Sequence, residues 1–197
     1  MNILIPAAGL GTRFKDQYDG PKNMIDVKGD PMLVASAKSL RMSSPEHTFI
    51  FVIPENDHTV ELKERLTIEF PGCRVLNIAG ESQGAAETAV SAQGFFPEDE
   101  ELLIANCDQI MAWSDESRDK IFDKLREFDA GIVTIKSDDP KHSYLNLETG
   151  EIVEKEVVSD QALVGLHYWK HGKDFTNSTR LMMQSGKRSK GEYYIGP

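Results

Sequence analysis

The stretch that most constrains the fold is a short apolar run that leads into a turn of small residues. Residues 2–22 read NILIPAAGLGTRFKDQYDGPK. Three large aliphatic side chains at positions 3–5 come directly before turn signals, which predicts a buried strand. The small residues at positions 7, 8, 9 and 11 let the backbone turn sharply and approach a ligand closely. The stretch therefore predicts a strand that ends in a ligand-binding loop.

This loop has the residues of a phosphate-binding site. Consecutive backbone N–H groups in such a turn form a concavity that binds anions. Arg13 adds a forked donor that suits phosphate, and Lys22, after Pro21, adds a second cation. We expect a triphosphate to bind here, in contact with Ala8, Gly9, Gly11 and Thr12.

Two commoner phosphate motifs are absent. The chain has no G-x-x-x-x-G-K-[ST] loop, and the dinucleotide fingerprint would need a small residue where Phe14 stands. Because a structural turn also explains most isolated G-x-G pairs, the prediction depends on the whole string.

The string A-A-G-L-G-T-R-F, followed by P-K, resembles the signature of the nucleotidylyltransferases that activate sugar phosphates and related phosphorylated small molecules. The family pattern is G-x-G-[ST]-R-[FLM] followed by P-K-[PAS]-[LM], and residues 9–14 and 21–24 match it except at Asn23. Sugar-nucleotide members usually carry Pro or Ala at that position. The resemblance implies that Arg13 steadies the departing pyrophosphate and that Lys22 steadies the α-phosphate, so we treat both as catalytic.

Strands and helices alternate through the first two thirds of the chain. The patterns predict strands at 3–5, 48–53, 73–78, 101–105 and 130–135, and helices at 31–42, 59–70, 84–93 and 115–128, with Ser114 as N-cap of the last. This alternation favours a mainly parallel sheet covered on both faces. With the resemblance, it predicts an α/β, Rossmann-like mixed sheet of the nucleotidyltransferase (GT-A-like) type.

The pattern changes after residue 139. Short strands are predicted at 144–147, 152–158 and 162–169, a helix at 173–184, and an extended piece at 192–195. We expect a single domain, residues 1–197, with a nucleotide-binding half at 1–139 and an acceptor-binding half at 140–197. Family members continue beyond the final G-E-Y-Y-I-like string, so we also expect a C-terminally shortened chain.

Charge and cysteine content exclude several classes of protein. The net charge of −10 argues against a nucleic-acid binder, which would show a basic face. No apolar run approaches the length of a membrane helix, and no basic and apolar leader precedes the first strand. The two cysteines, Cys73 and Cys107, have no metal-ligand spacing and are expected to be reduced thiols. We therefore expect a cytoplasmic protein.

Gln83 and Gly84 are the candidate contacts to the nucleobase. Glutamine offers a donor and an acceptor that can pair with a pyrimidine edge, and glycine lets a flat ring lie against the backbone. A compact packing element is the alternative explanation for a glycine before an alanine-rich helix. The segment resembles the base-binding segment of the family, which implies a pyrimidine without separating cytosine from uracil or thymine.

Asp108 is the candidate metal ligand. It follows the apolar strand at 101–105, so its carboxylate should lie at the carboxyl edge of the sheet, where open α/β sheets bind ligands. Magnesium prefers hard oxygen ligands, one or two carboxylates together with phosphate oxygens. Residues 106–108 also match the [NG]-x-D of the family. The resemblance implies Mg²⁺, with Mn²⁺ as an alternative, and Glu192 as the second ligand.

Two acceptor contacts follow from the resemblance alone. Lys155 matches an E-K pair whose lysine lies near the phosphate of the acceptor, and Gly165 matches a strand glycine against which the substrate lies. His167, on the same strand, is expected to be a packed histidine without a chemical role.

Together these residues predict an enzyme that transfers NMP from an NTP, with a pyrimidine base, to a phosphorylated small molecule and releases pyrophosphate. The resemblance implies a sugar 1-phosphate acceptor and precursor synthesis for surface polysaccharides. Three alternatives stay open. They are a cytidylyltransferase for a non-sugar phosphate such as phosphocholine or a phosphorylated amino-acid derivative, a GT-A glycosyltransferase, which would normally show Asp-x-Asp, and a non-catalytic nucleotide-binding module. Self-association into a homo-oligomer is left open.

Overall fold

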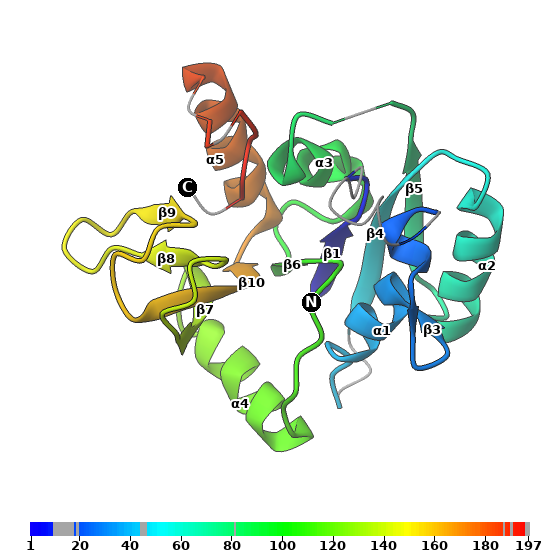
Figure 1. Ribbon diagram of the computed structural model, residues 1–197, viewed down its shortest axis with the longest axis horizontal. Coiled ribbons are helices and arrows are strands. Elements are labelled where there is room, and N and C mark those ends of the chain that lie inside the picture. Colours follow the sequence, from blue (N-terminus) through cyan, green and yellow to red (C-terminus); the bar gives the residue numbers. More distant parts are fainter. Residues whose placement is uncertain are drawn as a thin grey trace.

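The computed structural model describes residues 1–9, 18, 20–43, 47–80, 82–186, 188–189 and 191–195. Its centre is one mixed sheet with the strand order β5-β4-β1-β6-β10-β8-β9, and β7 pairs with β10 as well (Figure 1). The strands are β1 (Asn2–Pro6), β4 (Thr48–Pro54), β5 (Arg74–Ile78), β6 (Leu102–Ala105), β7 (Ala130–Lys136), β8 (Ser143–Leu145), β9 (Ile152–Glu154) and β10 (Gln161–Trp169). A separate hairpin joins β2 (Asp26–Val27) to β3 (Asp30–Pro31).

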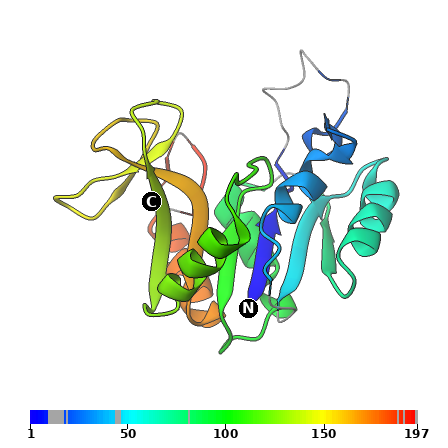
Figure 2. The ribbon, with the colours of Figure 1, turned by 90° about the horizontal axis from the view of Figure 1, so that it is seen from below.

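The helices lie on both faces of this sheet. They are α1 (Met32–Lys38), α2 (Thr59–Glu69), α3 (Ala85–Ser91), α4 (Asp115–Leu125) and α5 (Gly172–Ser185), with 3-10 turns η2 (Lys22–Met24) and η3 (Gln93–Phe95). In both views, α1 and α2 lie toward one end of the sheet and the β7–β9 region toward the other (Figures 1 and 2). Among the described residues, no helix combines the length and the apolar character that crossing a membrane would require.

The order of the strands follows from their burial. β1 pairs in parallel with β4 on one side and with β6 on the other, and all five of its residues are buried. Strands in the middle of a parallel sheet are covered on both faces, which explains why they are continuous apolar runs. β10 runs antiparallel to β6, so the sheet is mixed. The predicted α/β, Rossmann-like architecture is confirmed.

The core has two layers, one on each face of the sheet. On one face, Ile3 and Ile5 of β1 pack with apolar side chains of α1, α2 and α4. On the other face, Leu4 packs with side chains of α3 and α5, including Phe175. Successive residues of a strand point to opposite faces, so one apolar run supplies both layers.

Three predicted elements differ most from the structure. The first helix ends at Lys38, after which the N–H groups of Leu40 and Arg41 donate to the carbonyls three residues before them, at 3.0 and 3.2 Å. β9 ends at Glu154, because Lys155 adopts a φ of 55°, which no regular strand contains. The piece at 192–195 forms no strand: Glu192 makes an isolated bridge with Ser189, and Tyr193 bonds to the start of α3.

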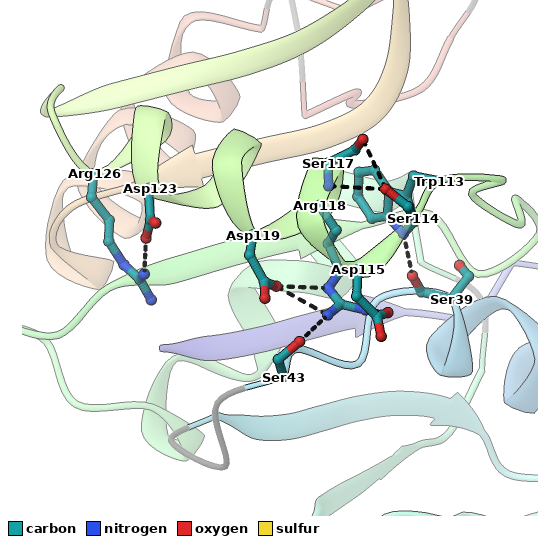
Figure 3. A network of polar contacts seen from close by, with 10 residues as sticks. All are labelled: Ser39, Ser43, Trp113, Ser114, Asp115, Ser117, Arg118, Asp119, Asp123 and Arg126. Carbon is teal, nitrogen blue, oxygen red and sulfur yellow. Dashed lines mark hydrogen bonds and ion pairs between the residues drawn. The ribbon is translucent and has the colours of Figure 1, made fainter.

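Helix α4 is anchored by a buried arginine (Figure 3). The Arg118 guanidinium donates to Asp115 at 2.8 Å, to Asp119 at 3.0 Å and to the Ser43 hydroxyl at 2.9 Å. The Ser43 hydroxyl, and after it the Arg118 guanidinium, lower the pKa of Asp119. At the start of the same helix the predicted N-cap is confirmed, since Ser114 accepts from the Ser117 N–H at 3.2 Å. The network joins α4 to the segment after α1.

His167 makes the stability of the fold depend on pH. It lies on β10 between Ile104 of β6 and Ile132 of β7, and burial lowers its pKa from 6.5 to about 4. The unfolded chain therefore binds a proton at a higher pH than the folded chain does. The stability linked to this residue is fully present above pH 6.5 and is lost as the pH falls toward 4, by up to about 1.4 kcal/mol per pH unit.

We expect His167→Gln to remove this component, because glutamine does not titrate. Urea unfolding at pH 7.0, 6.0 and 5.0 should show a smaller fall in the free energy of unfolding for the variant than for the wild type. If the free energy of unfolding fell by the same amount between pH 7.0 and 5.0 in both proteins, His167 would not be the titrating group.

Candidate functional site

The carboxyl ends of β1 and β6 lie side by side and carry the loops that hold most of the predicted site. The two strands pair in parallel, with Leu4 opposite Ile104. Ala8 is buried, whereas Gly9 is exposed, and a Cβ atom at Gly9 would meet no atom of the described residues within 4 Å. The chain thus leaves the buried interior at Gly9. The predicted site residues Gly11, Thr12 and Arg13 lie outside the described residues.

Lys22 and Asp108 meet at this edge of the sheet. The Lys22 Nζ lies 3.1 Å from the Asp108 Oδ2, and the Lys22 side chain is 15% exposed whereas that of Asp108 is 36% exposed. Burial opposes the lysine charge, but the adjacent Asp108 carboxylate favours it, and the pKa of Lys22 is raised. Burial also raises the pKa of the Cys107 thiol, so the sulfur stays protonated at neutral pH. The result is a fixed ammonium beside a partly exposed carboxylate.

Asn23 fastens the Lys22 segment to the end of β1. Its side chain is 2% exposed, and its Nδ2 donates to the carbonyl of Ala7 at 2.7 Å. The other amide atom, Oδ1, is buried and has no hydrogen-bond partner among the described residues. Asn23 is the position where the chain departs from the family pattern, and the structure shows a side-chain-to-backbone hydrogen bond there.

A buried serine on α1 sets the loop that carries Asp108. The Ser36 hydroxyl lies 2.6 Å from the carbonyl oxygen of Gln109 and 3.1 Å from that of Asn106, the residues that bracket Cys107 and Asp108. Ser36 is fully buried. One turn later, the Ser39 hydroxyl accepts from the N–H of Met111 at 3.1 Å. Nothing in the sequence indicates this role of Ser36, because a single serine within an apolar helix has no distinguishing pattern.

Gly165 supports the same loop from β10. Its φ is +66°, and a Cβ atom there would lie 2.2 Å from Nδ2 of Asn106 and 2.6 Å from Oε1 of Gln109. These two amides bond to each other at 2.9 Å, and the Asn106 N–H donates to the Gly165 carbonyl at 3.2 Å. The protein's own amides therefore fill the space over Gly165. Its predicted contact with the acceptor stays a prediction.

Gln83 and Gly84 form a second group with Tyr193. Gly84 has a φ of +132°, and a Cβ atom there would lie 2.5 Å from the carbonyl oxygen of Tyr193. The Tyr193 N–H donates to the Gln83 carbonyl at 2.8 Å, and the Ala86 N–H donates to the Tyr193 carbonyl at 3.0 Å. Packing alone therefore requires a glycine at position 84. Glu192, next to Tyr193, lies beside this group and has no recorded contact with Asp108.

Arg188 is a member of this group that sequence analysis missed. Its guanidinium donates to the side-chain oxygen of Gln83 and stacks 4.3 Å over the Tyr193 ring. The same side chain donates to the Gly191 carbonyl at 3.1 Å. Its position relative to Gln83 depends on the tertiary fold, so no spacing in the sequence could have indicated it.

Lys155 lies in the β8–β9 region and is held in a strained conformation. Its φ is 55°, and its N–H donates to the His142 carbonyl at 3.1 Å. Its Nζ lies 3.2 Å from a carboxylate oxygen of Glu154, whose side chain is 7% exposed and also accepts from the Ser143 hydroxyl. Such backbone strain is often found at binding sites. In the described part of the chain, no recorded contact joins Lys155 to Lys22 or to Gln83.

The oxygen donors at Asp108 suit magnesium. No group of three or more histidine, cysteine, aspartate or glutamate side chains gathers anywhere in the described ranges. Magnesium does not need such a cage, since it is usually bound by one or two carboxylates together with substrate phosphates. A partly exposed carboxylate at the carboxyl edge of the sheet is compatible with that requirement, although one of its oxygens is shared with Lys22.

Comparison with known proteins places the chain in a family. The protein-family model named MobA-like NTP transferase domain matches residues 3–164. The chain belongs to this family. It is a nucleotidyltransferase domain, as the resemblance of the first loop predicts.

One curated relative is similar to the chain over much of its length. The 2-C-methyl-D-erythritol 4-phosphate cytidylyltransferase of Solibacter usitatus (strain Ellin6076) is 30% identical over 145 residues. The alignment covers 70% of this chain and 57% of that enzyme, so the chain spans a little over half the length of the relative.

Solved structures share the fold over nearly the whole chain. The nucleoside-diphosphate-sugar pyrophosphorylase of Vibrio cholerae RC9 superposes with a TM-score of 0.77 at 21% identity, covering 99% of this chain and 84% of that one. The inositol-1-phosphate CTP transferase of T. maritima has a TM-score of 0.70 at 18% identity, with 98% and 76% covered. At these identities the likeness establishes the fold.

Ser36→Ala tests whether the buried hydroxyl holds the Asp108 loop. Removing it leaves the Gln109 carbonyl oxygen, at 2.6 Å, without the single O–H donor of this serine, and we expect a loss of about 1–3 kcal/mol in the free energy of unfolding. Hydrogen–deuterium exchange at residues 106–109 should become faster. The matched variant Ser39→Ala should instead speed exchange near Met111. Unchanged exchange at 106–109 in Ser36→Ala would contradict the assignment.

Proposed function

We propose that the chain transfers NMP from a pyrimidine NTP to the phosphate of a small molecule, with a sugar 1-phosphate as the first candidate, and releases pyrophosphate. The observation that carries the proposal is the Lys22–Asp108 pair at the carboxyl edge of the sheet, where the segment of Lys22 is hydrogen-bonded to Ala7 at the end of β1. Family membership supports the reaction class.

In the proposed reaction, an oxygen of the acceptor phosphate attacks the α-phosphorus of the NTP. A new P–O bond forms there, and the bond to the β-phosphate breaks, so pyrophosphate leaves with the bonding electron pair. The acceptor phosphate is already ionised near neutral pH, so no general base is needed. The protein contributes by positioning the reactants and offsetting their charge.

Lys22 is the residue that we assign to the α-phosphate. Its raised pKa keeps it an ammonium, and Asn23 ties its segment to the end of β1. The charge is therefore in place before the negative charge on the phosphate develops, which is how preorganised groups stabilise a transition state. From the sequence, Arg13 takes the departing pyrophosphate, and Ala8, Gly9, Gly11 and Thr12 line the phosphate loop.

Asp108, with Glu192 as the proposed second ligand, would hold a magnesium or manganese ion. When bound, such an ion offsets phosphate charge. Ser36 and Gly165 act on the same loop by fixing the position of Asp108. Lys155, held by Glu154, is the proposed contact to the acceptor phosphate.

A second candidate is cytidylyl transfer to a non-sugar phosphate. The relative from Solibacter usitatus is a cytidylyltransferase whose acceptor is an erythritol phosphate, which supports this candidate. Asn23, which stands where sugar-nucleotide members usually carry Pro or Ala, is consistent with it. An acceptor panel separates the two candidates.

The test is a pyrophosphate-release assay. The wild type is incubated with magnesium, each of the four common NTPs and dTTP, against a panel of sugar 1-phosphates, phosphocholine and phosphorylated polyols. We expect release with one pyrimidine nucleotide and one acceptor class. No release with any combination would reject the function.

Lys22→Ala should lower kcat by about a hundredfold or more, because the fixed charge at the α-phosphate is lost. Lys28→Gln, which removes a lysine from the exposed turn between β2 and β3, should retain wild-type turnover. Thermal unfolding of both variants checks that they are folded. A near-normal kcat in Lys22→Ala would remove Lys22 from the mechanism.

A further inference from the structure

The side-chain amide of Gln83 is held at both ends. The Arg188 guanidinium donates to its oxygen Oε1, while its nitrogen Nε2 lies 3.3 Å from Oε1 of Glu87. The other oxygen of Glu87 accepts from the backbone N–H of Gln83. The exposed glutamine that was predicted to contact the base is therefore clamped between a cation and an anion.

The chemistry of the two partners fixes which way the amide faces. A guanidinium only donates hydrogen bonds, and a carboxylate only accepts them. If the amide rotated by 180°, its NH₂ group would face the donors of Arg188, and its oxygen would face the carboxylate of Glu87. Both contacts would become repulsive. The clamp therefore holds one orientation of an amide that is otherwise free to flip.

The clamp residues are themselves positioned. Arg188 stacks over Tyr193, which is buried, and the Tyr193 N–H donates to the backbone carbonyl of Gln83. Glu87 lies one helical turn after Gln83, on α3. The side-chain oxygen and nitrogen of Gln83 each retain one further hydrogen-bonding position, because the clamp uses one at each end.

A fixed amide can tell cytosine from uracil. Along its pairing edge, cytosine presents the N4 donor and then the N3 acceptor, whereas uracil and thymine present the O4 acceptor and then the N3–H donor. A free glutamine pairs with either order by flipping, because its amide carries one donor side and one acceptor side. A glutamine that cannot flip pairs with one order and meets the other with two repulsive contacts.

We propose that Arg188 and Glu87 are specificity-determining residues, which fix the Gln83 amide so that the site discriminates between cytosine and uracil or thymine. The inference rests on the proposed function, since it requires a pyrimidine nucleotide at Gln83. A correct hydrogen-bonded pair is expected to give about a fivefold to 150-fold preference.

The experiment compares the wild type with Glu87→Gln, Arg188→Met and the double variant. Glu87→Gln keeps the shape of the side chain but can donate as well as accept, so it permits the flip. The readouts are Kd for CTP, UTP and dTTP by isothermal titration calorimetry with magnesium, and kcat/KM for each nucleotide. We expect the wild type to prefer one base class by at least about fivefold. In the double variant, the ratio should fall to within about threefold of unity.

Arg180→Met is the matched control. Arg180, on α5, makes the same kind of contact, donating to the side-chain oxygen of Gln93 at 2.6 Å. This variant loses the same charge from the same region and should keep the wild-type preference. Thermal unfolding verifies that each variant is folded.

The possible failures are distinguishable. If the wild type binds no nucleoside triphosphate, the proposed function and the clamp are both rejected. If it binds pyrimidine nucleotides without preference, or if the double variant weakens both classes equally and keeps the ratio, the clamp is rejected while the proposed function stands. If Arg180→Met also changed the preference between base classes, the effect would come from net charge, and the clamp would again be rejected.

Discussion

The parallel pairing of β1 with β6 is the constraint on which the rest of the site depends. Both strands are buried among apolar side chains, so neither can carry polar chemistry within its length. Polar groups have to follow the strands, and parallel pairing brings both carboxyl ends to the same edge. This is why Lys22 and Asp108, 86 positions apart in the sequence, lie within 3.1 Å.

The loop after β6 is held by neighbours more than by its own turn. Ser36 binds it from α1, and Gly165 accommodates its amides from β10. A carboxylate that works on phosphates must be fixed without being buried, since burial would favour its neutral form. The Ser36 hydroxyl lies within hydrogen-bonding distance of a backbone carbonyl on each side of Asp108, which fixes the backbone of the loop. The Asp108 side chain itself remains 36% exposed to solvent.

The fold could be predicted from the sequence because its strands are apolar runs and its helices have a 3.6-residue period. The ends of elements were predicted less well where a single residue decides, as with the φ of Lys155. Lys22, Asp108 and Gln83 could be named because each lies in a local motif. Ser36 and Arg188 could not, since they act through tertiary contacts, and Glu87, although only four positions from Gln83, is not distinguished from an exposed helix residue by any pattern. The sequence did not decide why position 84 is a glycine. The structure gives a packing reason, because the backbone of Tyr193 lies against it.

The docking of Tyr193 against Gly84 also affects the order of folding. Gln83 and Arg188 are separated by 105 positions, and closing so long a loop costs conformational entropy that only the rest of the fold can offset. During synthesis, the segment before α3 must therefore wait for a much later part of the chain before it takes its final shape. A nucleotide that bound to both Gln83 and Arg188 would link two segments that are distant in the sequence. Its binding free energy would then stabilise these segments against local unfolding.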